Sequence, residues 1–270
     1  MSNYMELIRH RRSVRTFDGE ALAPETLQKI ANYASAADNP YNLPITYKIL
    51  DAKKDKLSSP VIVGSDTYIA GKMTRAPHAE EAFGYSFEKI VLFVESLGLG
   101  TTWIGGTMDR KAFEAAMELK DGEVLPCVSP LGAPAKKMSL RETMMRTGIK
   151  ADSRLDFEKL FFENDFSTPL TAEKAGSLAT ALEAVRLAPS AVNRQPWRAV
   201  VCGNKVHFYE KRTPGYVSAD GWDMQKIDIG IALCHFDLVA QECGIKTAFE
   251  INDPGIEAGD LIYIATYVVD

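Results

Sequence analysis

Apolar side chains recur with helical spacing in two separated stretches, residues 24–36 and 172–187. Pro24 stands where the first turn of a helix tolerates proline. Each predicted helix is followed by a polar loop with Pro and Asn, and then by an apolar, strand-like stretch at 45–50 or 198–203. The apolar positions that define the two helical faces are Leu27, Ile30, Ala31 and Ala34 in the first stretch and Ala175, Leu178, Leu182 and Val185 in the second.

Two further stretches, 82–100 and 223–245, are apolar around much of a helical circumference, which predicts buried central helices. Both end at a glycine, Gly98 or Gly244, as expected for a left-handed helix terminus. The order of elements thus repeats with a step of roughly 150 residues, which is too long for a solenoid. We interpret the chain as two tandem copies of one domain, residues 1–165 and 166–270, in one intertwined globular unit.

Short apolar runs predict strands, and the mostly apolar run at the C-terminus predicts a central strand rather than an edge strand. The dipeptide Gly203–Asn204 predicts a hairpin between two of them. Helices and strands do not alternate strictly, which favours an α+β fold over a doubly wound parallel sheet. The predicted strands are 60–64, 125–133, 199–203, 205–210 and 260–269.

Composition narrows the classes of function. The chain has 270 residues and a net charge of −5, so no global basic field favours nucleic acid. Four scattered cysteines indicate free thiols in a reducing cytoplasm, and four scattered histidines show no metal-ligand spacing. We see neither a signal peptide nor an apolar run long enough for a membrane span. We therefore expect a cytoplasmic protein that binds no metal, membrane or nucleic acid.

Three arginines and a serine cluster in the segment RRSVR, residues 11–15. Guanidinium groups bind phosphate through forked, charge-assisted hydrogen bonds, and a serine hydroxyl can add a donor. The cluster indicates a phosphate site, although a solvated basic segment would explain the same residues.

A second segment, GLGTTWIGGTMD at 98–109, has paired glycines at an expected strand end. Such glycines let a backbone approach a flat ligand closely, but a tight turn explains them equally well. Neither the GxGxxG nor the GxxxxGK[ST] phosphate motif is present. A third segment, APSAVNRQPW at 188–197, is too polar for a core strand and too rich in proline for a helix. Its Ser190 and Asn193 are also suited to capping a turn.

Together the three segments resemble the FMN-dependent nitroreductases. RRSVRTF is similar to that family's RRSxRxF and APSAVNRQPW to its PSxxNxQPW. GLGTTWIGG and the later LPCVSPLGAPA are similar to GLGxxWxGG and to a strand that ends in G-x-P-A. The resemblance covers most of the chain and implies an α+β nitroreductase fold that binds FMN and uses NAD(P)H as electron donor.

The resemblance also implies how the segments cooperate. Family members are usually homodimers whose two FMN sites take RRSxR and the GG turn from one subunit and PSxxN from the other. Here the first copy carries RRSVR and WIGG, and the second carries APSAVNRQPW. We therefore expect a monomer that acts as a fused pseudo-dimer with one FMN per chain. The implied cofactor-binding residues are Arg11, Arg12, Ser13, Arg15, Ile104, Gly105, Gly106, Arg154, Pro189, Ser190, Ala191 and Asn193.

Arg154 belongs to this set because DSRLDFEKLFF, residues 152–162, is similar to the family's PRxPLEEL, in which a basic residue contacts the phosphate. The insertion KKMSLRETMMRTGIK before it leaves Lys137 and Arg141 as alternatives. Arg12 or Arg15 would lie near flavin N1 and O2, and no side chain is expected to act as a general acid.

The implied reaction passes a hydride through flavin N5 from NAD(P)H to a nitroaromatic, a quinone or a similar small two-electron acceptor. Two alternatives stay open, namely a different flavin reaction on the same fold and a non-catalytic flavin-binding protein. Residues 65–84 and 211–224 are the candidate lid segments over the substrate.

Overall fold

The computed structural model describes residues 3–219 and 221–270, which form two compact units. The N-terminal unit is His10–Ala151, and the C-terminal unit combines Asp152–Asp270 with the described residues of Met1–Arg9. These units differ from the predicted halves, which divide after residue 165. Strand β5 explains the difference, because residues 161–163 pair with β6 of the C-terminal unit. Whether each unit is one copy of a duplicated domain stays a prediction.

The N-terminal unit contains an antiparallel sheet in which one central strand, β2, pairs with the other three. The strands are β1 (Ile45–Asp51), β2 (Thr67–Thr74), β3 (Glu123–Val124) and β4 (Val128–Leu131). Sequence patterning placed a strand at 60–64, and this prediction is wrong, because that stretch contributes only an isolated bridge from Val63 to Thr16. The prediction of a lid at 65–84 is also wrong for residues 67–74, which form β2.

Strand β2 is buried on both faces. Tyr68 and Ala70 belong to a core cluster that also contains Phe113 of α5. Gly71 points to the opposite face, where a Cβ atom would lie 2.6 Å from the rings of Tyr47 and Phe83. Burial on both faces explains why residues 68–73 of β2, apart from Lys72, are apolar rather than alternating.

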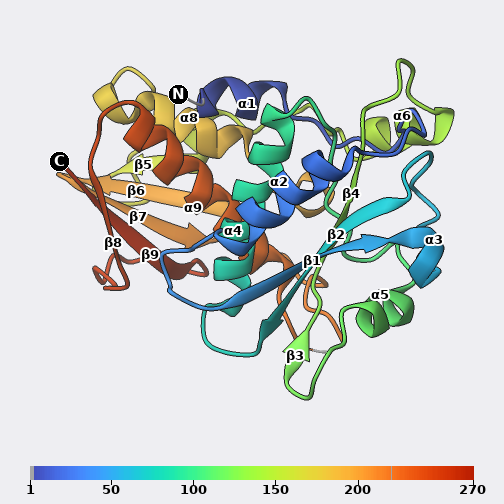
Figure 1. Ribbon diagram of the computed structural model, residues 1–270. Helices are drawn as coiled ribbons and strands as arrows, with labels where there is room; N and C mark the ends of the chain where they lie inside the picture. The colour runs from blue at the N-terminus through green and yellow to red at the C-terminus, as the bar shows by residue number, and fades with distance from the viewer. Residues whose placement is uncertain (1–2, 220) are drawn as a thin grey trace. The chain divides into compact units, whose positions relative to one another are not determined.

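Five helices belong to the N-terminal unit, and α4 is buried over most of its length, as predicted. Helix α2 begins at Pro24, and the turn that ends α4 has Gly98 at φ 74°. Figure 1 shows α2 and α4 beside the sheet. The helices are α2 (Pro24–Ser35), α3 (Ala52–Asp55), α4 (Ala79–Ser96), α5 (Arg110–Ala116) and α6 (Leu140–Gly148).

The C-terminal unit has a five-stranded sheet in the order β5-β6-β7-β9-β8, in which only the β5–β6 pair is parallel. The last strand lies between two neighbours, which confirms the predicted central position. A two-residue turn at Gly203 and Asn204 joins β6 and β7, so the predicted hairpin is also confirmed. The strands are β5 (Phe161–Glu163), β6 (Trp197–Cys202), β7 (Lys205–Glu210), β8 (Thr247–Glu250) and β9 (Ile262–Val269).

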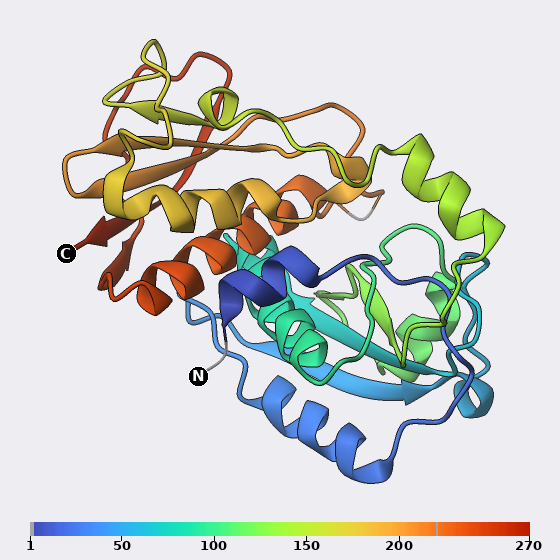
Figure 2. The same cartoon turned by 90° about the horizontal axis from the view of Figure 1, so that it is seen from above.

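Helices α8 and α9 lie side by side against this sheet (Figures 1 and 2). Helix α9 is buried along most of its length, and Gly244 follows it at φ 80°, both as predicted. The helix predicted from residue 172 begins regular α-helical geometry only at Ala179. The helical segments are α1 (Tyr4–His10), α7 (Phe157–Leu160), α8 (Ala179–Leu187) and α9 (Met224–Glu242), with 3-10 turns η1 (Gly176–Leu178) and η2 (Ala191–Asn193).

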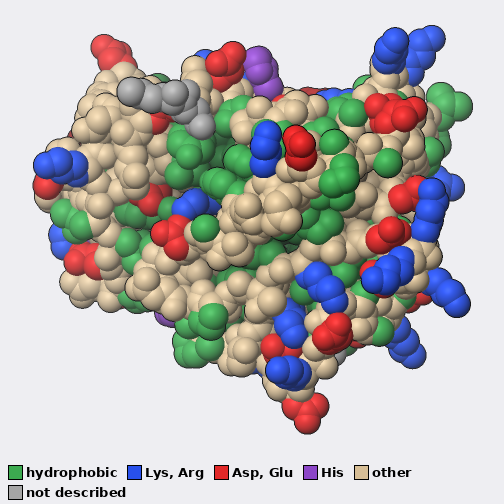
Figure 3. All heavy atoms as spheres, in the orientation of Figure 1, with side chains coloured by type: hydrophobic (Ala, Val, Ile, Leu, Met, Phe, Trp, Pro, Cys, Tyr) green, Lys and Arg blue, Asp and Glu red, His purple; other side chains and the backbone are tan. Residues whose placement is uncertain are grey.

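The main elements follow the same order in both units: a helix, two antiparallel strands, a long buried helix and further strands. Figure 3 shows acidic and basic side chains intermixed on the visible face, as the modest net charge of −5 suggests. None of the helices in the described part of the chain combines the length and hydrophobicity that crossing a bilayer requires.

Candidate functional site

The arginine-rich segment is fixed in the N-terminal unit by backbone pairing. Val14 donates from its backbone nitrogen to the carbonyl of Thr101 at 2.8 Å, and Phe17 donates to Val63 at 2.8 Å. The Val14 side chain is 2% exposed and packs against Gly100, where a Cβ atom would come within 2.8 Å of it. Because side chains alternate along an extended segment, the buried Val14 places Ser13 and Arg15 on its other side.

Arg11 is almost completely buried, with 5% of its side chain exposed. Its Nε lies 3.9 Å from Glu88 on α4, and Glu88 also accepts a hydrogen bond from Trp103 Nε1 at 3.0 Å. Among the described residues, the Nε and Nη1 atoms of Arg11 have no hydrogen-bond partner. Buried donors without an acceptor are costly. Arg11 therefore has donors available for an anion.

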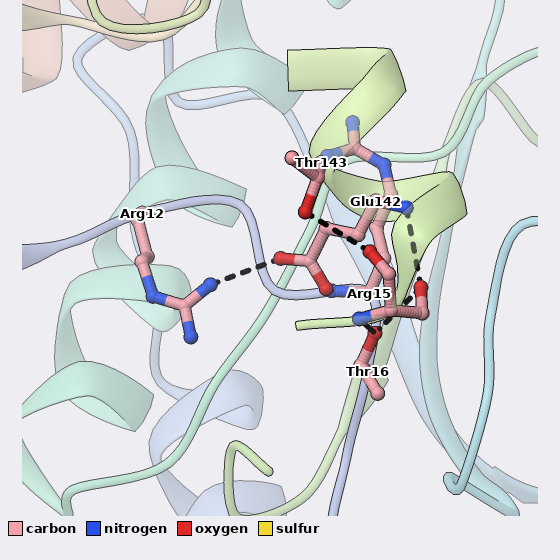
Figure 4. Close-up of polar contacts among 6 residues, drawn as sticks. Arg12, Arg15, Thr16, Glu142 and Thr143 are labelled. Atoms are coloured by element: carbon pink, nitrogen blue, oxygen red, sulfur yellow. Dashed lines mark hydrogen bonds and ion pairs between the residues drawn. The ribbon is translucent and has the colours of Figure 1, made fainter. Parts of the chain in front are cut away.

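Arg12 and Arg15 are both held by Glu142 of α6, which is 1% exposed. Figure 4 shows its carboxylate between them: Arg12 Nη1 donates to one oxygen at 2.9 Å, and the backbone nitrogen of Arg15 donates to the other at 3.2 Å. Burial lowers the pKa of the Arg15 guanidinium, and the Glu142 charge opposes this shift. Nη1 of Arg15 is buried without a hydrogen-bond partner in the described structure.

The predicted glycine turn follows an isolated bridge in which Ile104 and Val128 exchange two backbone hydrogen bonds of 2.9 Å. Neither Gly105 nor Gly106 has a positive φ, so the backbone here does not require glycine. A Cβ atom on Gly106 would meet no described atom within 4 Å beyond its chain neighbours. The structure therefore gives no conformational reason for these two glycines, and their role in binding a cofactor stays a prediction.

Arg110, at the start of α5, was not predicted from the sequence, and its guanidinium donates to the carbonyls of Gly105 and Leu125. Arg110 thus binds the turn through the carbonyl oxygen of Gly105. Because Arg110 is the donor, this contact does not use the backbone N–H groups of Gly105 and Gly106.

The loop APSAVNRQPW connects α8 to β6 in the C-terminal unit. Ser190 caps its turn, because Oγ accepts from the backbone nitrogen of Gln195 at 2.9 Å and the carbonyl accepts from Asn193 at 3.0 Å. Val192, Asn193 and Gln195 all have φ between 50° and 55°. For a β-branched residue such as Val192 this left-handed conformation is strained.

Asp228 of α9 binds this loop through its carboxylate and was not predicted from the sequence. Its two carboxylate oxygens each lie 3.0 Å from the backbone nitrogen of Ala191. Burial raises the pKa of Asp228 well above its ordinary value, and nearby Asp223 and Glu210 raise it further. The available signal was a carboxylate at a position between the apolar residues Ile227 and Ile229 of this helix.

Arg154 lies against the same loop, and its predicted contact with a phosphate stays a prediction. It donates to Asn193 Oδ1 at 3.4 Å and to the carbonyl of Leu187 at 3.1 Å. The alternative Arg141 instead donates to the carbonyl of Pro60 in the N-terminal unit. The structure thus brings Arg154 and the loop from Pro189 to Asn193 together.

The predicted residues therefore form two groups, one in each compact unit. The N-terminal unit holds Arg11, Arg12, Ser13, Arg15, Ile104, Gly105 and Gly106. The C-terminal unit holds Arg154, Pro189, Ser190, Ala191 and Asn193. That both groups contact one cofactor stays a prediction.

Comparison with solved structures identifies the fold. A putative nitroreductase from Thermotoga maritima covers 99% of this chain and 93% of its own at 21% identity, with a TM-score of 0.64. A nitroreductase family protein from Clostridium novyi NT covers 50% of this chain and 86% of its own at 21% identity, with a TM-score of 0.43. An FMN-dependent nitroreductase from Clostridium difficile R20291 covers 59% and 98% at 19% identity, with a TM-score of 0.46.

The α+β nitroreductase fold expected from the sequence is thereby confirmed. The sequence model of the family described as "Putative TM nitroreductase" matches residues 3–240. The chain belongs to this nitroreductase family. None of the curated proteins matches the sequence.

Proposed function

We propose that this protein is an FMN-dependent NAD(P)H oxidoreductase of nitroreductase type. The observation that carries the proposal is a set of buried nitrogen atoms, Nε and Nη1 of Arg11 and Nη1 of Arg15, that have no hydrogen-bond partner among the described residues. Such donors fit a phosphate group, which accepts several charge-assisted hydrogen bonds. Family membership supports the assignment to oxidoreductase chemistry.

The described residues fit the parts of FMN. Arg11 and Arg15, with Ser13, would bind the phosphate, and the open space at Gly106 suits a flat ring close to the backbone. The family resemblance implies that the loop from Pro189 to Asn193 also binds the cofactor. Bound FMN would supply the hydride-transfer chemistry, while these residues bind and orient it.

The test uses the purified full chain loaded with FMN. We expect a yellow protein that NADH or NADPH bleaches without oxygen and that a nitroaromatic or a quinone reoxidises. Protein that stays colourless when FMN is added would contradict the whole proposal. A flavin that neither nicotinamide reduces would instead favour a non-catalytic flavin-binding protein.

A further inference from the structure

Glu142 occupies an unusual position for an acidic residue, because it is buried beside the arginines proposed to bind a phosphate. It lies in the first turn of α6, where Ser139 caps the helix by accepting from the Glu142 backbone nitrogen at 3.1 Å. The sequence SLRE has the spacing of a capping box, in which the Glu side chain normally turns back to the cap residue. Here the Glu142 carboxylate binds Arg12 and Arg15 instead.

The Glu142 contact falls where the backbone pairing of the arginine segment changes partner. Val14 donates its N–H to Thr101, and Phe17 donates its N–H to Val63. The N–H of Arg15 lies between these two pairings, and Glu142 accepts it. The carboxylate therefore fixes the part of the segment from which the Arg15 side chain extends.

A second set of hydrogen bonds attaches the start of α6 to the next residue of the segment. Thr16 Oγ1 lies 3.1 Å from Ser139 Oγ and accepts from the Ser139 backbone nitrogen at 3.1 Å. The carbonyl of Thr16 accepts from Ala135 at 3.0 Å. Glu142 and the residues before α6 thus bind Arg12, Arg15 and Thr16, which are labelled together with Glu142 in Figure 4.

We propose that Glu142 is a positioning residue of the phosphate site, an inference that rests on the proposed function. Glu142 uses a donor of Arg12 and fixes the Arg15 backbone. Arg11 and the Arg15 guanidinium keep the buried donors that remain for the phosphate.

Electrostatics alone leads to the opposite expectation. A carboxylate near a phosphate dianion repels it, so removing the charge would tighten FMN binding. If Glu142 instead positions the site, removing its carboxylate should weaken FMN binding, because the Arg12 side chain and the Arg15 backbone N–H lose their acceptor. The sign of the change in affinity therefore separates the two effects.

The experiment compares the wild type with Glu142→Gln and Glu142→Asp. The first variant removes the charge and one acceptor oxygen, and the second keeps the charge but shortens the reach. Glu20→Gln, at an exposed position of the same unit, is the matched control for loss of one charge. FMN and riboflavin, which lacks the phosphate, are titrated by quenching of flavin fluorescence, and circular dichroism checks the fold of each apoprotein.

We expect both Glu142 variants to raise the dissociation constant for FMN about tenfold, the value of one charge-assisted hydrogen bond. The affinity for riboflavin should change less than about twofold, because riboflavin has no phosphate for these arginines to bind. A change of that size is no larger than the effect of one weak, exposed contact. Glu20→Gln should bind both flavins like the wild type. If Glu142→Gln does not fold, Glu142→Asp alone decides.

Two results would overturn the positioning role while leaving the proposed function intact: Glu142 variants that bind FMN as tightly as the wild type or more tightly, and equal losses for FMN and riboflavin. A wild-type chain that binds neither flavin would refute the proposed function, and the role of Glu142 with it.

Discussion

Arg11 and Arg12 are neighbours in the sequence with opposite surroundings in the structure. Arg12 donates a hydrogen bond to Glu142 at 2.9 Å, whereas Arg11 lies 3.9 Å from Glu88 and has two buried nitrogen atoms with no hydrogen-bond partner among the described residues. From the sequence, both are predicted to bind the phosphate, because residue type alone does not show which N–H donors already have acceptors in the folded protein. The structure makes Arg11 the stronger candidate.

We therefore predict that Arg11→Ala raises the dissociation constant for FMN by roughly tenfold to a hundredfold, the effect of losing hydrogen bonds from a charged donor. Arg11→Lys should recover part of the affinity, since it keeps the charge but not the planar fork. Fluorescence titration measures both. Arg9→Ala, at an exposed position, is the control, and equal affinity of the Arg9 and Arg11 variants would refute the prediction.

Asp228 supplies a pH-dependent prediction. Its raised pKa means that the folded state binds the proton more tightly than the unfolded chain, whose carboxyl has a pKa of about 3.9. The free energy of unfolding should therefore fall as pH rises from that value through the raised pKa, by about 1.4 kcal/mol for each pH unit that separates the two pKa values. The amide oxygen of Asp228→Asn can still accept from the Ala191 backbone nitrogen, but the amide does not titrate. This variant should therefore lack the part of the decline in stability that comes from Asp228.

Urea unfolding at a series of pH values measures the effect. The exposed variant Asp260→Asn should keep the decline of the wild type, since it removes a charge away from the loop. A pH dependence unchanged by Asp228→Asn would show that this carboxyl does not control stability.

At the scale of elements, local patterning located the long helices but not the central strand of the N-terminal sheet. Helices α4 and α9 have wide apolar faces followed by Gly98 and Gly244, and both glycines adopt the expected positive φ. Strand β2 was missed because both of its faces are buried, which removes the alternation that identifies a strand. The apolar run at 60–64 resembled a strand, but its pairing is limited to the single bridge between Val63 and Thr16 and does not extend into a ladder.

Gly71 tests the packing of β2 against α4. Gly71→Ala should lower the free energy of unfolding by about 1–3 kcal/mol, because the new methyl group overlaps the Tyr47 and Phe83 rings. Gly148→Ala is the control, since a Cβ there meets no described atom within 4 Å and the residue is helical. Urea denaturation measures both, and equal stability of the two variants would contradict this packing.

At the scale of the whole molecule, the predicted site residues are divided between two compact units. Each unit contains one part of the proposed site, and in the described chain neither contains both RRSVR and the PSAVN loop. This division supports the proposal of a fused pseudo-dimer. The predicted boundary after residue 165 differs from the observed division after Ala151, because β5 pairs with β6.

We predict one FMN per chain and a monomer in solution. Flavin absorbance after denaturation, divided by protein concentration, gives the stoichiometry, and size-exclusion chromatography with light scattering gives the mass. Ser190→Ala should leave the stoichiometry at one in protein that still folds, since the proposed phosphate-binding residues belong to the N-terminal unit. Two FMN molecules per chain would refute the single-site proposal.

The sequence by itself determined the α+β class, the order of the main helices and strands, the two buried helices and the family, because these depend on apolar periodicity and on contiguous motifs. Only the tertiary structure decided that Glu142 pairs with Arg12, that Asp228 holds Ala191, and that Arg154 contacts Asn193. These partners lie between 37 and 130 residues apart, so their contacts depend on how the chain folds back on itself. The same distinction applies to APSAVNRQPW. Its motif is local, but the residues on either side of the strained Val192 are bound by Asp228 and Ser153, which lie far away in the sequence.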